Sequence, residues 1–521
     1  MITQEELLQK TPEELAELFL SLQTILFEKE KNLSNKENEI ALLRHQLNVL
    51  LQAKYGRKSD KVDPSRQGQL FNEAEAPEIE SVEIQKAEEE ITTVSSHHRK
   101  KPGRKPLPAE LPRVRKEYDL SEVEKACHCG CQLTKIGEEI SEQLELIPAK
   151  LNVIQHVKFK YACKSCEETI KTAKGPNQPI PKSIASASLL AHVLVSKFKD
   201  HLPLYRQEQI FQRMQIDIPR NTLAYWVVRC GELLKPLINQ MKKIQIKYDI
   251  GYADETTIQV LKEKDKSAES KSYMWVFIGG PPEQRNFIYE YHPTRAQTVP
   301  KEYWQDFKGF LHSDGYAGYT NLFASYPIQG AHCWAHARRK FTDIIKANKT
   351  QKAGLSHWAV AQIAKLYQIE RDAKDNYLLP AEIKKIRQEK SKPLLQEMKD
   401  WLDKNIERTL PKTPIGLALN YCLKYWDNLM RYIEDGRLDI DNNLAERAIK
   451  HFATGRKNWL FADTTHGAES SAVIFSLIET CKYHQIEPYL YLKSVLEKIT
   501  ECTTDDDYLK LLPFNLKTGD G

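Results

Sequence analysis

The stretch KYDIGYADETTIQVL, residues 247–261, sets an acid, Asp254, within apolar and β-branched sequence. One apolar run ends at the acid and a second follows it. This pattern predicts two adjacent strands, with Asp254 near the end of the first. Acids at strand ends are usually solvated or serve turns, so the meaning of Asp254 depends on what else the chain brings to it.

Two further acids have related settings. Asp314 lies in GFLHSDGYAGY, after a short apolar strand and before a glycine-rich turn. Glu446 lies in DIDNNLAERAIK, on a predicted helix whose N-cap is Asp441, Asn442 or Asn443. Two acids on strand ends and one on a later helix can converge, and converging carboxylates bind hard divalent cations such as Mg²⁺.

Composition indicates a large, mildly basic protein of several domains. The chain has 521 residues, of which 28% are charged and 41% hydrophobic, with a formal net charge of +5 and a pI near 8.4. No apolar run reaches the ~18–20 residues of a membrane span. The N-terminus, MITQEELLQK, is acidic and lacks the pattern of a signal peptide. We therefore expect a cytoplasmic protein.

The first part of the chain predicts self-association followed by contact with DNA. A long helix over about residues 15–54 repeats Leu26, Leu33, Ile40 and Leu47 every seven positions, which is typical of a coiled coil and predicts a homodimer or higher oligomer. The alternative is an amphipathic helix packed on its own chain. An acidic linker and then a basic, proline-rich arm follow; the arm suits phosphates or a minor groove, or merely solubilises, and its basic residues include Arg99, Lys100, Lys101, Arg104 and Lys105.

Five of the ten cysteines lie between residues 127 and 166, which favours a metal module over disulfides. Four thiolates from two turns suit a tetrahedral, structural Zn²⁺. Cys163 and Cys166 form an ordinary CxxC pair, whereas CHCGC at the other end offers one thiol too many. The first pair is therefore Cys127 with Cys129, or Cys127 with Cys131; buried free cysteines are the alternative reading.

The middle and end of the chain predict a helical region and then an α/β core. Around Pro219 one helix ends and another begins near Asn221 and Thr222, with the polar residues Arg220 and Asn221 at its start. This pattern resembles a helix-turn-helix but is also common in plain helical bundles. Strand candidates are IQIKYDIGYAD, TTIQVLK, SYMWVFIGG, NFIYEYH, GFLHSD and PIQGAHC, in the order expected of a ribonuclease-H-like sheet. Residues 355–432 predict an inserted helical subdomain.

Several motifs resemble the insertion-sequence-sixty-six family of bacterial transposases, which belong to the DDE class. The resemblance covers nearly the whole chain, beginning with YGRKSDK, GRKPLP and the cysteine module. Its most specific motifs are YADETTIQVL, LHSDGYAGYTNL, HCWAHARRKF and IDNNLAERAIKHFATGRKNWLFA. It implies that Asp254, Asp314 and Glu446 are the catalytic acids, and that Cys333 and His336 form a CxxH element. The CHCGC half-knuckle departs from the family pattern.

The expected activity is cleavage of insertion-element ends and joining of the 3′-hydroxyl to target DNA. The three acids would hold two Mg²⁺ ions about 3.5–4 Å apart, with Asp254 bridging them. Accessory proteins of the same element are possible partners. Expected contacts to double-stranded DNA come from His336, Arg338, Arg456 and Lys457 on phosphates and from Trp459 stacked on a base. The alternatives are that the four are ordinary basic residues of the surface or of helix starts, and that His336 is a hydrogen-bonded histidine of the core. The rival functions are a catalytically inert DNA-binding regulator and a structure-specific ribonuclease-H-like nuclease.

We therefore expect a multidomain α/β protein with the following segments: a coiled-coil helix (1–60), an acidic then basic linker (61–118), a zinc module (119–180), a helix-turn-helix-like region (181–243), the first part of the ribonuclease-H-like core (244–350), a helical insertion (351–435), the second part of the core (436–500) and a C-terminal tail (501–521).

Overall fold

The computed structural model describes residues 29, 151–162, 170–347 and 354–516. The predicted coiled coil, the acidic and basic linkers and the five cysteines of the zinc module lie outside the described residues. The chain divides into two compact units, one of Glu80–Pro176 and one of Met1–Ile79 with Asn177–Gly521. Among the described helices, none is long and apolar enough to cross a membrane.

The described part of the smaller unit contains a short hairpin. Strands β1 (Lys160–Ala162) and β2 (Ile170–Thr172) pair antiparallel, with Lys160 opposite Thr172.

The larger unit is organised around a mixed sheet with strand order β5-β4-β3-β6-β7, and β8 pairs with β3. Strands β4 and β5 run antiparallel to their neighbours, whereas β6, β7 and β8 pair in parallel. The strands are β3 (Ile250–Lys262), β4 (Lys271–Gly279), β5 (Asn286–His292), β6 (Gly309–Ser313), β7 (Ile328–His332) and β8 (Ala462–Thr464). The mixed α/β class predicted from the sequence is confirmed.

Two predictions around the central strand are wrong. The two strands expected on either side of Asp254 form one continuous strand, β3, and the acid lies within it. The strand expected from Ile244 begins only at Ile250, because helix α6 (Arg220–Lys247) continues through that sequence. Gln245 holds this last turn in place: its side-chain amide donates to the carbonyl oxygens of Phe277 and Asn286, both at 3.0 Å.

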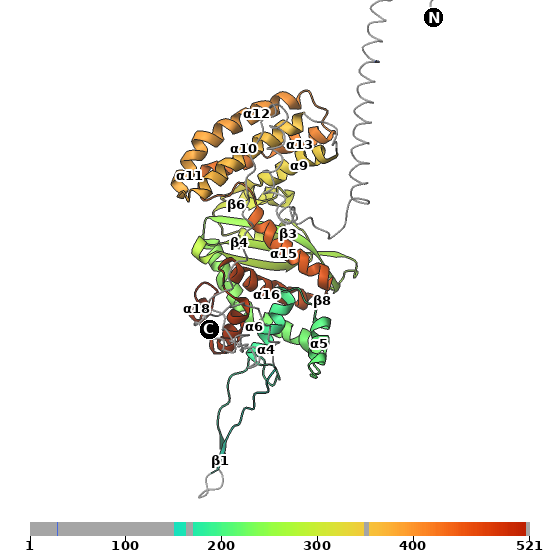
Figure 1. The fold of residues 1–521 in the computed structure, drawn as a ribbon, viewed down its shortest axis with the longest axis vertical. Helices are drawn as coiled ribbons and strands as arrows, with labels where there is room; N and C mark the ends of the chain where they lie inside the picture. Colours follow the sequence, from blue (N-terminus) through green and yellow to red (C-terminus); the bar gives the residue numbers. More distant parts are fainter. Residues whose placement is uncertain (1–28, 30–150, 163–169, 348–353, 517–521) are drawn as a thin grey trace, which may run out of the picture. The chain divides into compact units, whose positions relative to one another are not determined.

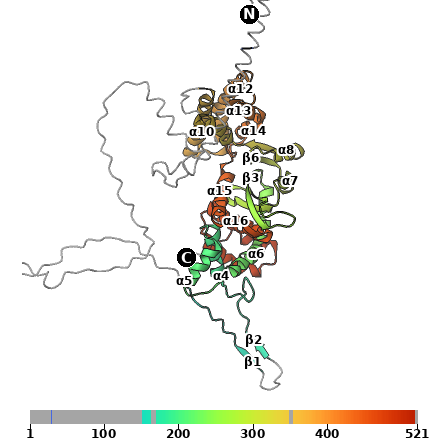
Figure 2. The same ribbon diagram turned by 90° about the vertical axis from the view of Figure 1, so that its right-hand side faces the viewer.

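Helices cover both faces of the sheet. On one face, α15 (Asn443–Trp459) packs on β3 and α16 (Thr465–Tyr483) packs on β5 and α6. On the other face, Trp304 of α7 (Thr298–Trp304) contacts the ring of Phe277, and Tyr319 contacts Trp275. Figure 2 shows α7 and α15 on opposite sides of β3. The remaining helices of these layers are α4 (Ala187–Phe198), α5 (Leu204–Arg213), α8 (Thr320–Ser325), α9 (Trp334–Ala347), α17 (Pro488–Lys498) and α18 (Asp505–Lys510).

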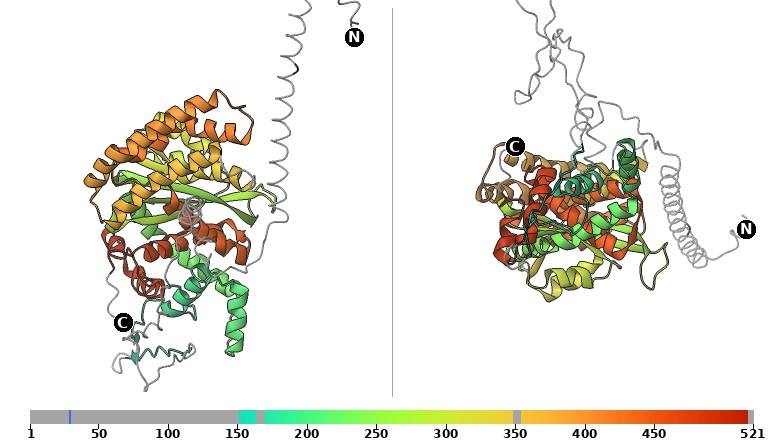
Figure 3. Two further views of the ribbon diagram at one scale, coloured as in Figure 1. Left: turned by 45° about the horizontal axis from the view of Figure 1, so that its top comes forward. Right: turned by 90° about the horizontal axis from the view of Figure 1, so that it is seen from below.

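A group of helices separates the second acid from the third along the chain. It packs on α9 through α10 and α13, and on β7 through α14. The green strands lie between this orange group and the red C-terminal helices (Figures 1 and 3). The group consists of α10 (Leu355–Asp375), α11 (Pro380–Ile386), the π-helical turn η5 (Arg387–Ser391), α12 (Lys392–Ile406), α13 (Pro414–Lys424), α14 (Trp426–Met430) and η6 (Arg431–Glu434).

The C-terminal segment packs on the core, at least as far as residue 516. Leu512 is fully buried, the Tyr491 hydroxyl donates to the Leu511 carbonyl at 2.9 Å, and Lys243 of α6 pairs with Asp505 at 2.6 Å. Polar residues dominate 501–510, so no local pattern predicted this packing.

Candidate active site

Asp254 and Asp314 occupy equivalent positions on neighbouring parallel strands. Tyr252 of β3 lies opposite His312 of β6, and each acid follows two residues later. Because side chains alternate along a strand, the even spacing directs both carboxylates toward the same face. Gly315 then turns the chain with a φ of +79°. Asp314 Oδ1 accepts a 2.9 Å hydrogen bond from the backbone N–H of Tyr316.

The edge of β3 is open where Asp254 lies. β6 pairs with the first residues of β3, and β8 joins the same edge only from Val260 onward. Polar side chains of the Glu446 segment use the gap: Asn442 donates to the Ala253 carbonyl at 3.0 Å, and Arg456 donates to the Thr257 hydroxyl at 3.0 Å. These contacts bind the start and the end of α15 to the strand that bears the first acid.

Glu446 lies in the first turn of α15. Asn442 occupies the N-cap position, which was one of the predicted alternatives. Its side chain makes no capping hydrogen bond to the helix and bonds to β3 instead. Asp441 accepts the Asn443 N–H at 3.0 Å and the Tyr367 hydroxyl at 3.0 Å. Burial raises the pKa of Asp441 to about 6. The helix start is therefore fixed by contacts to β3 and to the helical insertion.

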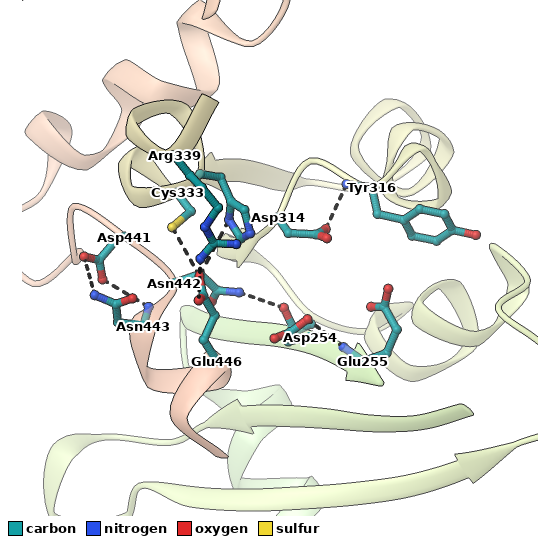
Figure 4. A network of polar contacts seen from close by, with 12 residues as sticks. Asp254, Glu255, Asp314, Tyr316, Cys333, Arg339, Asp441, Asn442, Asn443 and Glu446 are labelled. Atoms are coloured by element: carbon teal, nitrogen blue, oxygen red, sulfur yellow. Dashed lines mark hydrogen bonds and ion pairs between the residues drawn. The ribbon is translucent and has the colours of Figure 1, made fainter. Parts of the chain in front are cut away.

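Asp314 and Glu446 lie close enough to Asp254 for their charges to affect its ionisation. The pKa of Asp254 is raised well above its usual range, first by burial and then by the charges of Glu255, Asp314 and Glu446. Figure 4 shows the three side chains arriving from β3, from the end of β6 and from α15. Burial and the charge of Asp314 also raise the pKa of Glu255 to about 7. Crowded carboxylates of this kind are typical of a cation site.

Arg295 is a basic residue beside these acids. Its Nε donates to Glu255 Oε1 at 2.6 Å, and its Nη2 lies 3.8 Å from Asp314 Oδ2. The guanidinium also lies over the ring of Tyr316, 3.9 Å from the centroid, and the Tyr316 hydroxyl donates to the Arg295 carbonyl. The side chain is thus held in place and remains 39% exposed, available to a polyanion.

Three side chains that follow β7 converge on Glu446. Cys333 Sγ lies 3.7 Å and His336 Nδ1 3.6 Å from Glu446 Oε1, and Arg339 Nη2 lies 3.7 Å from Oε2. Burial, together with the charges of Asp441 and Glu446, raises the pKa of the Cys333 thiol. Burial lowers the pKa of the His336 imidazole, although the charge of Glu446 acts in the opposite direction. The structure therefore brings His336 to the acids, together with the cysteine of the same CxxH element.

Other residues expected to contact DNA have different surroundings. Arg338 lies toward Tyr367 with its Nε buried, so Arg339 takes the place beside Glu446. Lys457 is exposed. Trp459 packs edge-on against Phe452, with centroids 5.6 Å apart. Its role in stacking on a base stays a prediction.

Arg220 and Asn221 are exposed at the start of α6, as the sequence pattern requires of a helix that could read DNA. The Arg220 backbone N–H donates to Glu208 of α5 at 2.9 Å. The expected residues that lie outside the described part of the chain are Arg99, Lys100, Lys101, Arg104, Lys105, Cys127, Cys129, Cys131, Cys163 and Cys166.

Sequence reasoning missed Glu255, Arg295 and Arg339, and it proposed Asn442 only as a helix cap, without its contact to β3. A signal existed for two of them, because Glu255 adjoins the first acid and Arg339 lies three residues beyond His336, on the same helix face. Arg295 carries no local pattern that separates it from ordinary loop residues, and the capping pattern at Asn442 does not indicate a bond from its side chain to β3.

Family models match most of the chain. A model described as "Transposase IS66 family" matches residues 182–470, more than half of the sequence. Shorter models match residues 42–115 ("Transposase C of IS166 homeodomain"), 124–167 ("zinc-finger binding domain of transposase IS66") and 476–514 ("IS66 C-terminal element"). The zinc-finger match spans all five clustered cysteines.

Two relatives from Sinorhizobium fredii (strain NBRC 101917 / NGR234) are similar over almost their whole length. The chain is 32% identical to uncharacterized protein y4hP over 501 residues, which are 92% of this chain and 88% of the relative. It is 30% identical to uncharacterized protein y4qI over 510 residues, covering 94% and 91%. With the matched models arranged in order along the sequence, the chain belongs to the IS66 family of transposases.

Proposed function

We propose that the protein is a DNA transposase that cleaves the ends of its element and joins the 3′-hydroxyl to target DNA, with Asp254, Asp314 and Glu446 as the catalytic acids. The observation that supports this most strongly is the convergence of the three acids, in which Asp254 is buried among like charges. The order β5-β4-β3-β6-β7, with three antiparallel strands followed by two parallel ones, supports a ribonuclease-H-like core.

The donor set fits magnesium. Asp254, Asp314 and Glu446 offer carboxylate oxygens, the ligands that Mg²⁺ prefers, and their mutual repulsion is relieved when a cation binds. Bound Mg²⁺ ions would activate water or a 3′-hydroxyl and stabilise the departing oxygen. No protein nucleophile is needed for such a displacement.

The basic residues around the acids can position a DNA backbone. Arg295 flanks Asp314 through its 3.8 Å contact, Arg339 flanks Glu446, and Arg456 lies along β3 beyond Asp254. A guanidinium can donate two hydrogen bonds to one phosphate. These residues hold the scissile strand against the acids, while His336 orients Glu446 through its 3.6 Å contact.

The N-terminal half would recognise the element ends. We assign the coiled coil to pairing of subunits, the zinc module and basic arm to binding of DNA, and α5 with α6 to base or backbone contacts. The zinc-finger match over residues 124–167 supports a structural Zn²⁺ held by Cys163, Cys166, Cys127 and either Cys129 or Cys131.

The test is cleavage of a labelled element end in Mg²⁺ by the full-length protein. Wild type should nick the end and transfer the strand, whereas Asp254→Asn should bind the end and fail to nick it. The matched control is Asp463→Asn, an exposed acid of β8 paired with Lys262 at 2.8 Å, which should nick normally. Binding without nicking by wild type would identify an inert regulator, and cleavage of RNA–DNA hybrids or junctions without strand transfer would identify a nuclease.

A further inference from the structure

Cys333, His336 and Glu446 form a compact cluster of three different ligand types. Cys333 directly follows β7, His336 lies one turn later on α9, and Glu446 comes from α15. One ligand atom of each lies within 4.8 Å of the other two. Figure 4 shows Cys333 and Glu446 facing each other between the two helices.

We propose that this cluster binds a thiophilic divalent cation of the Zn²⁺ class, at a site separate from the zinc module. Ligands about 2.0–2.3 Å from a tetrahedral Zn²⁺ stand roughly 3.3–3.6 Å from one another. The Sγ–Oε1 and Nδ1–Oε1 distances are 3.7 and 3.6 Å, so these two pairs need only a small closure, and the ligand atoms of Cys333 and His336 lie within 4.8 Å of each other. A thiolate, an imidazole and a carboxylate favour Zn²⁺ over Mg²⁺, which prefers oxygen alone.

The surroundings leave these ligand atoms available to a cation. His336 Nδ1 is buried and makes no hydrogen bond among the described residues. Cys333 is fully buried and has no disulfide partner. On binding, the thiol proton is released to solvent and the sulfur–metal bond forms in its place, with no change of oxidation state. Water can complete the coordination, since the His336 side chain is 24% exposed.

The cluster shares Glu446 with the proposed catalytic acids. A Zn²⁺ ion on Cys333 and His336 would draw Glu446 Oε1 away from Asp254 and Asp314, so that Zn²⁺ inhibits the reaction supported by Mg²⁺. This consequence depends on the proposed function, whereas binding of Zn²⁺ does not.

Binding is tested with Zn²⁺ itself on the full-length protein. Wild type should hold one more equivalent of Zn²⁺ than Cys333→Ser, measured by metal analysis after dialysis against a weak chelator. The matched control is Cys422→Ser, another fully buried free cysteine, on α13, which should hold as much as wild type. Equal zinc content in wild type and Cys333→Ser would overturn the proposed site.

A spectroscopic measurement keeps the test valid if Cys333→Ser folds poorly. His336→Gln alters a partly exposed side chain and retains every cysteine. The proteins are loaded with Co²⁺ and their absorption spectra are compared. The thiolate-to-cobalt absorption of wild type should exceed that of His336→Gln, whereas the spectra of wild type and Cys422→Ser should be the same. Absence of the first difference in folded protein would overturn the site.

Inhibition is read separately from binding. In Mg²⁺, the Zn²⁺ concentration that halves nicking should rise at least ~10-fold in His336→Gln, the scale on which loss of a ligand weakens metal sites. If the inhibitory Zn²⁺ concentration is unchanged in His336→Gln although the zinc content of this variant is reduced, the inhibitory role is refuted and the proposed binding site still stands. If wild type itself does not nick DNA, the proposed function fails while the zinc measurements still decide the site.

Discussion

Replacement of Arg387 by methionine should unfold the core at a much lower temperature. Arg387 lies in η5 with only 3% of its side chain exposed, and its guanidinium makes five hydrogen bonds. Nε and Nη2 donate to Glu370 at 2.9 and 2.6 Å, and the other three bonds, of 2.7–2.8 Å, reach the backbone carbonyls of Tyr432, Asp435 and Leu438. The variant leaves a largely buried carboxylate without its cation and three carbonyls without a donor.

The expected loss is about 3–5 kcal/mol, the usual cost of removing one partner from a buried ion pair. At about 2–4 °C per kcal/mol for a domain of a few hundred residues, Tm should fall by about 6–20 °C. Circular dichroism of the metal-free protein measures this shift. Arg387→Lys keeps the charge but not the planar fork, so its loss should be intermediate.

Arg437 provides the matched control. It makes ion pairs with both Asp249 and Asp435, at 2.6 and 2.8 Å, but its side chain is 36% exposed. Solvent screening limits such pairs, so Arg437→Met should cost about 1 kcal/mol or less. If the two methionine variants lowered Tm equally, burial would not be what gives Arg387 its importance, and the reasoning would fail.

Three further perturbations follow from buried contacts. In metal-free protein, Asp254→Asn should raise Tm above about pH 4, the ordinary pKa of an aspartate. The raised pKa means that wild type loses stability as pH rises and the buried acid ionises, so scanning calorimetry across pH should show a smaller loss in the variant, in which Glu255 and Asp441 still titrate. Ser476→Ala removes the acceptor for the Tyr289 N–H at 2.8 Å on the outer edge of β5, so stability should fall by about 1–3 kcal/mol and exchange of the Tyr289 amide hydrogen should accelerate. A Cβ on Gly231 would lie 2.4 Å from Ser470 Cβ, so Gly231→Ala should separate α6 from α16 at a cost of about 1–3 kcal/mol in chemical denaturation, partly restored by Ser470→Gly.

The sequence predicted the positions of most strands, but it did not predict that the two segments around Asp254 form one continuous strand. Alternating apolar residues located β4, β5, β6 and β7 within a residue or two, because burial of one or both faces leaves a period that can be read locally. The polar residues between Asp254 and Thr257 suggested a break, yet β3 continues through them because β4 pairs with that whole segment. Pairing is a property of two segments, so one segment alone cannot reveal it.

The acids themselves were predictable, whereas the partners that fix them were not. Asp254, Asp314 and Glu446 lie in distinctive motifs. The contact of Arg339 with Glu446 joins residues more than a hundred positions apart, and no periodicity encodes it. Arg387 gave no signal, since a lysine- and glutamate-rich helical segment predicts a solvated arginine instead of one that is 3% exposed.

The carboxylates of Asp254, Asp314 and Glu446 repel one another when ionised, so contacts other than those to a metal ion must hold them together. The segment before Glu446 is fixed to β3 by a 2.6 Å hydrogen bond from the Tyr252 hydroxyl to Asp439 and by the amide of Asn442 on the Ala253 carbonyl. Buried polar contacts of this kind tolerate few alternative geometries, since each one left unmade costs about 1–3 kcal/mol. These contacts therefore hold the three acids facing one another, and under the proposed function their mutual repulsion would be relieved when Mg²⁺ binds.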